Sequence, residues 1–542
     1  MSHNSSNTTL LQKTGIVLFA AAMLIFTGAL FMTSFQLDES SVKSAINDDY
    51  QYPFVEQQMT ALKGKEYGNI FSFMLAFNGA MKKAQAAVKT DVENKLKLTT
   101  GDGEYWNKVL QDYKVKTSRL SAARTSAAGF LPGNVWLVFC LSILLGIAGA
   151  LMYNLPKLRF LPGIKNNHIY HSKLHSRGWP GMLLGSYLIG FYIVLYFFPE
   201  YLVSWIILMD PVSLALNGGL ASQWFLYGFL YTVAIVVMGI RMMIKYRHNT
   251  YQLVRTGSVM FFQTAFAFLI PQILALLHQP APDLKNIWPL DYSFFFEYRL
   301  DELTQSGGLG IFMLVWGIAL FVTGVPILTY FYGKRWYCSW VCGCGGLAET
   351  LGDPFRQLSS KKLKAWKVER WLIHAVLVFA VVMTVMVVGT YFTENSRLFL
   401  IDSYTIRSWY GFAIGSIFAG VVGTGFYPLM GNRMWCRFGC PLAAYLGLVQ
   451  KFKSRFRITV NGGQCISCGN CSTYCEMGID VRHYAQRGQD VVRASCVGCG
   501  ICAAVCPRGV LRLENNGTGV GSRAQELRTV HFPETEVSLL KG

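Results

Sequence analysis

Long apolar segments alternate with shorter polar ones along most of this chain of 542 residues. Eight of them are long enough to cross a bilayer as a helix, which takes roughly 20 residues. The pattern predicts a mostly α-helical, polytopic membrane protein. The apolar patch 202–209 follows a short third span and is interpreted as a re-entrant or interfacial piece. The predicted spans are 15–35, 134–153, 181–198, 223–244, 258–277, 309–331, 371–392 and 411–429.

The loops between these spans alternate in charge. Three of them hold sixteen Lys and Arg residues, and the three that alternate with them hold four. Short loops rich in Lys and Arg stay in the cytoplasm. The split predicts that both chain ends are cytoplasmic and that segment 36–131 lies outside. The basic loops are 154–179, 244–256 and 332–370, and the others are 199–222, 278–307 and 393–410.

The apolar pattern also suggests domain boundaries. Residues 1–35 form a cytoplasmic tail and a first span, interpreted as an uncleaved anchor because no A-x-A cleavage site follows it. Segment 36–131 has a helical composition, and a plain helical hairpin is preferred over a small sensor or docking domain. Residues 132–460 form a seven-span domain and 461–515 a compact Cys-rich domain. A flexible tail, 516–542, is expected at the end.

The formal net charge of +19 fits nucleic acid, anionic lipid or membrane topology. Lys and Arg cluster beside apolar spans, and no nucleic-acid-binding motif is visible, so the charge is interpreted as a topology signal. Membrane lipid is therefore an expected partner and nucleic acid is not. Ten of the fourteen cysteines follow residue 435, and segment 36–131 has none. This distribution indicates metal ligation in a reducing compartment rather than a disulfide scaffold.

Two copies of C-x2-C-x2-C-x3-C lie in segment 461–515, 31 residues apart. Thiolates suit both iron–sulfur clusters and zinc, but structural zinc sites usually use two C-x2-C pairs or mixed Cys/His sets. The tandem therefore predicts a small α+β ferredoxin domain with two [4Fe–4S] clusters. In such domains the fourth cysteine of each motif binds the other cluster. The predicted ligands are Cys465, Cys468, Cys471 and Cys506 for the first cluster, and Cys496, Cys499, Cys502 and Cys475 for the second.

The two motifs differ directly after their fourth cysteine, where the first has Glu476 and the second has Pro507. Because the proline is a backbone device rather than a ligand, the exchange is expected to do little harm. Gly469, Gly498 and Gly500 are expected to let backbone N–H groups come close to the sulfur atoms and tune the potential.

A second repeat lies at the predicted cytoplasmic helix ends. Residues 333–343, GKRWYCSWVCG, resemble residues 431–441, GNRMWCRFGCP, at an offset of 98. Each copy has a C-x3-C pair, and positions i and i+4 of a helix share one face. Three interpretations remain open: a third metal centre or redox-active thiol site, small packing residues, and a disulfide switch. The four cysteines are Cys338, Cys342, Cys436 and Cys440, with Cys344 as an extra thiol.

Other candidate residues receive structural interpretations. No C-x-x-C-H occurs, so c-type haem is not expected, and His278 and His374 lie too far apart along the spans to share one haem. Asp210 and Asp402, at outer helix ends, could accept a proton from a quinol, although capping or loop roles are preferred. Cys140, alone in the second span, is interpreted as a packing residue.

The repeated C-x3-C motif followed by two ferredoxin motifs resembles the NosR/NapH family of membrane polyferredoxins, with related copper-site assembly proteins of the CcoG type. The resemblance covers roughly residues 180–515. The family pattern is C-x3-C-P twice; Cys440 and Pro441 match it, whereas Gly343 follows Cys342. Neither a covalent-flavin motif nor an immunoglobulin-like C-terminal module is found, which favours a NapH-like or truncated NosR-like protein.

This resemblance implies a subunit of an oxidoreductase in the bacterial cytoplasmic (inner) membrane, with its ferredoxin domain in the cytoplasm. Such a protein would pass electrons between quinol or a cytoplasmic donor and a periplasmic respiratory reductase or its maturation system. One alternative is a copper reductase or assembly factor for a metalloenzyme. Another is a membrane redox sensor that signals through segment 36–131.

Overall fold

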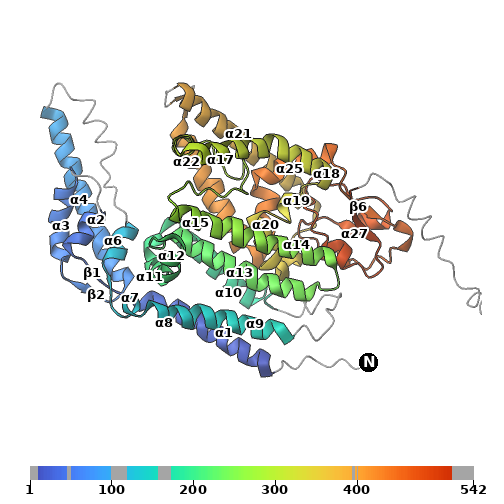
Figure 1. Ribbon diagram of the computed structural model, residues 1–542, viewed down its shortest axis with the longest axis horizontal. Helices are drawn as coiled ribbons and strands as arrows, with labels where there is room; N and C mark the ends of the chain where they lie inside the picture. Colours follow the sequence, from blue (N-terminus) through green and yellow to red (C-terminus); the bar gives the residue numbers. More distant parts are fainter. Residues whose placement is uncertain are drawn as a thin grey trace, which may run out of the picture. The chain divides into compact units, whose positions relative to one another are not determined.

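The computed structural model describes residues 10–45, 50–98, 119–156, 173–393, 397–398 and 401–515 (Figure 1). The chain forms two compact units, and each is described by itself. The first comprises Met1–Pro156 and Ile193–Leu230, and the second Lys157–Tyr192 and Tyr231–Gly542. The predicted flexible tail 516–542 and most of the basic loop 154–179 lie outside the described residues.

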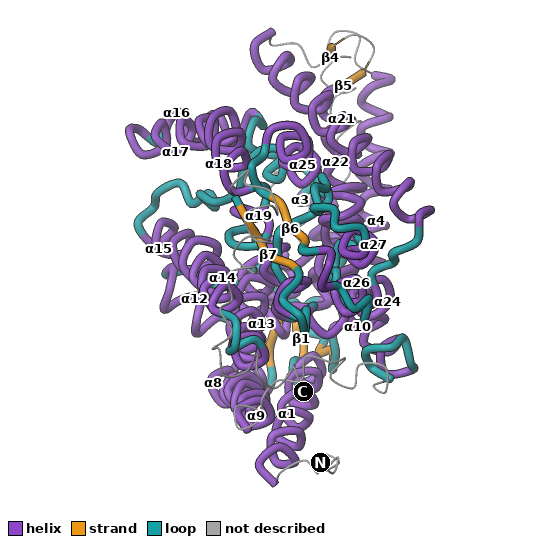
Figure 2. Tube along the Cα trace, turned by 90° about the vertical axis from the view of Figure 1, so that its right-hand side faces the viewer, coloured by secondary structure: helices purple, strands orange, loops and turns teal. Residues whose placement is uncertain are grey.

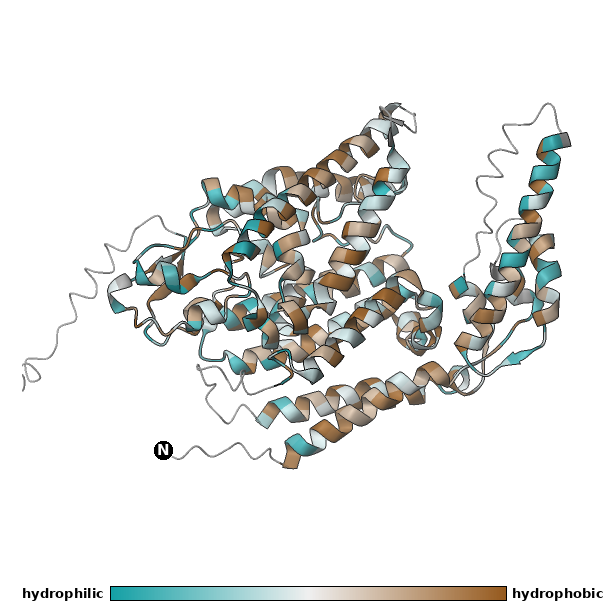
Figure 3. Cartoon of the chain, turned by 180° about the vertical axis from the view of Figure 1, so that it is seen from behind, coloured by the Kyte–Doolittle hydropathy of each residue, from teal (hydrophilic) through white to brown (hydrophobic). Residues whose placement is uncertain are grey.

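The described residues are mostly helical, as predicted. Seven of their helices are long and apolar enough to cross a membrane, which confirms a multi-pass helical fold. Figure 3 shows the apolar colouring running along these helices. The seven are Leu10–Phe31, Val135–Asn154, Trp179–Phe197, Gln223–Lys245, Thr250–Leu276, Gly307–Tyr332 and Leu363–Thr393.

The predicted eighth span, 411–429, is not among these seven helices. Its residues are helical, through α22 (Ser403–Tyr410), η10 (Gly411–Val422) and α23 (Gly423–Gly425). Glycine occupies five of the fifteen positions from 411 to 425, which lowers the hydropathy of the run. The sequence pattern thus located a helix correctly but overstated its apolar character.

The apolar patch 202–209, predicted as a re-entrant or interfacial piece, belongs to a bent helix pair in the first unit. Pro199–Leu208 and Asp210–Asn217 meet at 71°, the geometry of a broken span or a re-entrant loop. Asp210 forms an ion pair with Arg124, and its carboxylate accepts a hydrogen bond from the Ala221 N–H at 2.9 Å. These contacts confirm a structural role for Asp210 at the bend.

In the first unit, α1 (Leu10–Gly28) packs closely against α9 (Leu145–Asn154). A Cβ atom added to Gly15 would lie 2.7 Å from the carbonyl oxygen of Gly149, and a Cβ atom added to Gly149 would lie 2.7 Å from the carbonyl oxygen of Gly15. Only glycine allows this approach of two backbones, as in small-residue contacts between membrane helices.

Segment 36–131 is not a plain helical hairpin, so that prediction is wrong. Three short antiparallel strands pair in the order β2-β1-β3 and join the helices of the segment in a small α+β core. Phe35, Phe73 and Phe77 stack within this core. The strands are β1 (Ser34–Gln36), β2 (Glu66–Tyr67) and β3 (Ala127–Ala128), and the helices are α2 (Glu39–Ala45), α3 (Tyr52–Met59), α4 (Ile70–Leu98) and α6 (Arg119–Thr125).

In the second unit, π-helical turns interrupt several of the long helices. Such turns often mark functional sites. One helix runs through α14, η7 and α15, and another through α17, η8 and α18, while α21 is unbroken. Their bounds are α14 (Thr250–Phe261), η7 (Phe262–Leu269), α15 (Ile270–Leu276), α17 (Gly307–Ala319), η8 (Leu320–Gly324), α18 (Val325–Tyr332) and α21 (Leu363–Thr393).

The Cys-rich domain is a small α+β structure, as predicted. Strand β6 (Arg457–Val460) pairs antiparallel with β7 (Leu511–Glu514), with Val460 opposite Leu511 (Figure 2). Three short helices lie between the strands in sequence: α26 (Asn470–Thr473), α27 (Val481–Gln486) and α28 (Ile501–Ala504).

Candidate iron–sulfur and thiol sites

The two halves of the Cys-rich domain repeat the same backbone turns. Gly469 and Gly500, which precede α26 and α28, have φ angles of 79° and 75°. Ser467 has a φ of 57° where the second half has Gly498 at 63°. These residues have left-handed backbone conformations, which glycine adopts most readily. They turn each cysteine loop around a common centre.

The first four predicted ligands line one pocket. Cys465, Cys468, Cys471 and Cys506 share it with the side chain of Arg482. Cys468 is exposed and Cys471 is buried, so this group lies near the surface of the domain. Their grouping agrees with the crossed pairing of the motifs, while their role as ligands stays a prediction.

The second group, Cys475, Cys496, Cys499 and Cys502, lies deeper. Cys496 and Cys502 are buried, and Cys502 interacts electrostatically with the other three thiols. Burial raises the pKa of the Cys496 thiol to about 11. A buried group of thiols with raised pKa values becomes ionised only when a cation compensates the charge. This donor set therefore fits an iron–sulfur cluster.

Membrane-domain side chains hold the backbone of the second cysteine loop. Four of them donate hydrogen bonds of 2.8 to 2.9 Å to four successive carbonyl oxygens, those of residues 496–499. The loop is thereby fixed to three separate parts of the helical domain. In order along the loop, the donors are Gln450 Nε2, Ser339 Oγ, Tyr251 Oη and Gln252 Nε2.

The C-x3-C pairs do not lie on continuous helix faces, so that expectation is wrong. Cys338 ends α19 (Arg335–Cys338), and Cys342 is the N-cap of α20 (Gly343–Thr350). Cys436 lies in η11 (Trp435–Gly439), and Cys440 is the N-cap of α25 (Pro441–Lys453). Pro441 explains the second break, because the residue before a proline disfavours the helical conformation.

The structure nevertheless gathers the two pairs. Cys338, Cys342, Cys436 and Cys440 are each 5 to 6% exposed, belong to one buried cluster and interact electrostatically with one another. A hydrogen bond with the Cys344 thiol, assisted by the Gly345 N–H, lowers the pKa of Cys342 to about 6. Burial raises the pKa of Cys338 to about 12. The pKa of Cys342 is thus lowered, whereas burial raises the pKa values of Cys338, Cys436 and Cys440.

Among the described residues, the only group of three metal-ligating side chains whose donor atoms all lie within 4.8 Å of one another is Glu349, Glu476 and Cys499.

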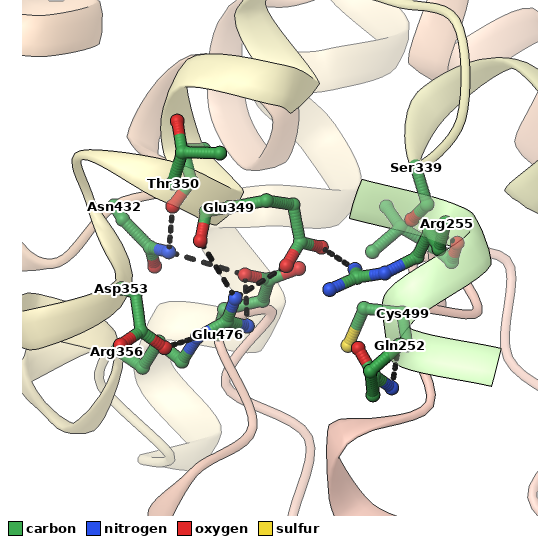
Figure 4. Close-up of polar contacts among 12 residues, drawn as sticks. Gln252, Arg255, Ser339, Glu349, Thr350, Asp353, Arg356, Asn432, Glu476 and Cys499 are labelled. Atoms are coloured by element: carbon green, nitrogen blue, oxygen red, sulfur yellow. Dashed lines mark hydrogen bonds and ion pairs between the residues drawn. The ribbon is translucent and has the colours of Figure 1, made fainter. Parts of the chain in front are cut away.

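Those two carboxylates are neutralised by arginines, as Figure 4 shows. Glu476 is fully buried and forms ion pairs with Arg356 at 2.6 Å and with Arg433 at 3.0 Å. Glu349 pairs with Arg255 at 2.6 Å and with Arg433 at 2.7 Å. The arrangement is a buried ion network, which removes the reason to infer a separate metal site there.

The pKa values of the two network carboxylates are shifted in opposite directions. Burial opposes ionisation of both, but three arginines hold the pKa of Glu349 well below its usual range. Burial, together with the neighbouring Glu349, raises the pKa of Glu476. Two carboxyl groups that meet in one site behave this way because their charges repel.

Arg433 joins this network to the C-x3-C thiols. Its Nη1 group donates hydrogen bonds to the Cys338 carbonyl at 3.2 Å and to the Cys436 sulfur at 3.5 Å. Since Glu476 follows Cys475 directly, one guanidinium links both cysteine groups. Sequence reasoning missed this link, although the repeated Arg of the C-x3-C motif was a visible signal.

Loop 278–307, predicted to lie outside the membrane, also reaches the thiol group. Tyr337, next to Cys338, donates a hydrogen bond to the Lys285 carbonyl at 2.9 Å. The Lys285 ammonium is buried and pairs with Asp283 at 2.5 Å. Part of this loop therefore packs inside the helical domain.

Asp402, the other aspartate considered for a quinol site, has a structural role. Its carboxylate accepts a hydrogen bond from the Thr405 N–H at 2.9 Å and caps the N-terminus of α22. Cys140 lies in the π-helical turn η3 (Cys140–Leu144) of the second span.

Comparison with known proteins supports the binding of iron–sulfur clusters by this chain. A family model described as a 4Fe–4S dicluster domain matches residues 464–511. A second model, a 4Fe–4S binding domain, matches residues 313–365 and again 410–459. Each of the latter segments contains one C-x3-C pair.

One curated relative is the "Putative electron transport protein YccM" of Escherichia coli strain K12, which is 28% identical over 156 residues. The match covers 27% of this chain and 43% of the relative. No solved structure matches. These findings support an iron–sulfur protein of electron transport, whereas the NosR/NapH resemblance stays a prediction.

Proposed function

We propose that this protein carries electrons between a cytoplasmic donor or membrane quinol and a partner outside the membrane, a respiratory reductase or its maturation system. The observation that carries the proposal is the direct contact between the second cysteine loop and the C-x3-C region. Ser339, next to Cys338, donates a hydrogen bond to the carbonyl of Val497, next to Cys496, at 2.8 Å. A covalent and hydrogen-bonded path therefore joins the two cysteine groups.

The ferredoxin cysteines are assigned to two [4Fe–4S] clusters, each of which supplies one-electron redox chemistry when bound. The chain's part is to hold the thiolates, exclude water from the second group and keep it against the membrane domain. The first group is Cys465, Cys468, Cys471 and Cys506, and the second is Cys475, Cys496, Cys499 and Cys502.

A third redox centre is assigned to Cys338, Cys342, Cys436 and Cys440. The duplicated match to a 4Fe–4S binding domain, together with the burial of all four thiols, supports an iron–sulfur centre there. A packing role explains neither the match nor the contact of Arg433 with the Cys436 sulfur.

Quinol has a candidate site beside the second cysteine group. A cavity of about 840 Å³ lies where α14 begins and α18 ends, within the usual size range of ligand pockets. Two of its lining residues, Gly500 and Ala503, belong to the segment that carries Cys499 and Cys502. Its aromatic and cationic lining residues are Tyr251, Tyr332, Trp336, Trp340, Arg335 and Arg512.

A copper-handling protein is the second candidate function. The observation in its favour is the fifth thiol, Cys344, which is hydrogen-bonded to Cys342 within a buried, sulfur-rich group. Soft thiolates select Cu(I) as well as iron–sulfur clusters. Metal analysis separates the two, since copper bound in the absence of iron at the C-x3-C site would favour the alternative.

The double variant Cys436→Ala, Cys440→Ala tests the proposed function. Full-length protein in native membranes is expected to keep both ferredoxin clusters and to lose electron transfer to the outer acceptor. Cys140→Ala, in the second span, is the matched control and should keep full transfer. Transfer at the parent rate by the double variant, with every respiratory acceptor, would show that these thiols are packing residues.

A further inference from the structure

Arg255 has an unusual environment for a buried arginine. It lies on α14, within a candidate membrane span, and its side chain is 1% exposed. Nη1 pairs with the Glu349 carboxylate at 2.6 Å, whereas the other two guanidinium nitrogens, Nε and Nη2, have no hydrogen-bond acceptor among the described residues. Buried donors almost always have acceptors, and the N–H groups of Nε and Nη2 have none among the described residues.

The second cysteine group lies next to these unpaired donors. Gln252, three residues earlier on the same face of α14, donates a hydrogen bond to the Cys499 carbonyl at 2.9 Å. The Cys499 sulfur is within 4.8 Å of donor oxygens on Glu349, the partner of Arg255, and on Glu476. Figure 4 shows the Cys499 sulfur beside the Arg255 side chain.

The buried ion network around Arg255 contains more cationic than anionic side chains. Five cationic side chains meet three carboxylates in this network, which leaves two positive charges unmatched when all are ionised. A cluster held by four thiolates is anionic and gains one more negative charge on reduction, so nearby cations favour its reduced form. The cations are Arg241, Lys245, Arg255, Arg356 and Arg433, and the carboxylates are Glu349, Asp353 and Glu476.

The first cysteine group has a different setting. Cys468 is exposed, and the two arginines that line its pocket, Arg482 and Arg508, are also exposed. Water screens exposed charges strongly. The two groups therefore repeat each other in backbone geometry but differ in the number and screening of the cations around them.

We propose that Arg255 donates hydrogen bonds to the sulfur atoms of the cluster held by Cys475, Cys496, Cys499 and Cys502, and makes it the more easily reduced of the two. This inference rests on the proposed function and gives it a direction. One electron leaves the exposed cluster, which is oxidised, and one electron reduces the buried cluster, with no bond broken and no proton moved. Electrons thus run inward, from the surface of the ferredoxin domain towards the C-x3-C thiols.

Redox titration of the purified full-length protein, followed by electron paramagnetic resonance, tests the inference. Arg255→Gln should move the more positive of the two ferredoxin potentials to a more negative value and leave the other unchanged. Arg255→Lys, which keeps the charge but loses the planar fork of donors, should give a smaller shift in the same direction. Arg482→Gln is the matched control, since its exposed charge should leave the more positive potential unchanged.

Assignment of the signals comes from Cys468→Ser, which alters only the first cluster and should perturb the more negative potential. Unchanged potentials in Arg255→Gln with intact iron content would overturn the inference. So would a Cys468→Ser variant that perturbs the more positive signal.

A measurement on the wild-type protein does not depend on the folding of any variant. Protein labelled with ¹⁵N-arginine should show a nitrogen hyperfine coupling in the pulsed spectrum of the more positive cluster, and its absence would also refute the inference. Failure of the proposed function is distinguishable, because a protein without both ferredoxin clusters would give no such signals at all.

Discussion

Glu476 and Pro507 occupy equivalent positions in the two halves of the ferredoxin domain, but their environments are opposite. The Glu476 carboxylate is fully buried against Arg356 and Arg433, whereas Pro507 is exposed. Only the half with the carboxylate can enter the arginine network of the membrane domain without leaving charges unpaired. We infer that this one difference orients an otherwise symmetrical domain.

Glu476→Pro introduces the residue that the second motif has at the equivalent position. It should release this half of the ferredoxin domain from the arginine network of the membrane domain. Removing one member of a buried ion pair costs about 3–5 kcal/mol, because the partner charge stays buried and unpaired. The variant should keep its iron but expose the loop 496–502, with faster hydrogen exchange there. Pro507→Glu, at the exposed position, is the control and should leave exchange unchanged. Equal protection of the loop in both variants would remove the orienting role of Glu476.

The arginine network could not be predicted from the sequence because its members are scattered along the chain. Arg356 lies 120 residues from Glu476, on a different element. By contrast, the grouping of the ferredoxin cysteines followed from their spacing, since three cysteines three residues apart must share one loop. Burial of a carboxylate against distant cations has no comparable local pattern.

At the scale of elements, the repeated C-x3-C motif correctly predicted which cysteines lie together. It did not predict the backbone conformation of the segments that carry them. The offset of 98 residues correctly brought Cys338 and Cys436 into one group. It also suggested two continuous helices, whereas the chain breaks at Cys342 and Cys440, whose ψ angles are 133° and 111°. The breaks turn each second thiol into the cap of a new helix, and Cys440 accepts a hydrogen bond from the Ala443 N–H at 3.3 Å.

The crossed pairing of the two ferredoxin motifs predicts which cluster each cysteine serves. Cys475→Ser changes the first motif but should damage the second cluster, because Cys475 groups with Cys496 and Cys502. Iron analysis should show a loss of up to about half of the eight iron atoms expected for two such clusters. The surviving spectrum should belong to the exposed cluster. Loss of the Cys468 cluster in this variant would contradict the crossed pairing.

At the scale of the whole chain, the ferredoxin domain indicates which loops share a side of the membrane. Within the second unit, it is contacted by Gln252 from loop 244–256, by Ser339 and Lys361 from loop 332–370, and by Gln450 from α25. The first two loops are the basic ones that predict a cytoplasmic location. The charge distribution and the folded contacts therefore agree on one face of this unit.

If the ferredoxin domain shares a side with these two loops, the helical run Ser403–Gly425 is expected to be an eighth span. It has 23 residues, within the usual range of about 17–25 for a transmembrane helix. Its glycines lower the mean hydropathy of the run. For this reason it is not among the helices that are long and apolar enough to count as candidate membrane spans. With this span, and with the bent pair Pro199–Asn217 as a re-entrant piece, we expect both chain ends on the cytoplasmic side.

Labelling with a membrane-impermeant thiol reagent tests this orientation. Thr60, exposed in the α+β segment after the first span, should react as Thr60→Cys in intact cells, because that segment is expected outside. Gln489→Cys, exposed in the ferredoxin domain, is the matched control and should react only after the inner membrane is permeabilised. Because the two sites are separated by seven further spans in the proposed topology, their opposite accessibility requires an odd number of crossings between them. Reaction of both positions in intact cells, or of neither, would show an even number and would exclude Ser403–Gly425 as a span or the bent pair as re-entrant.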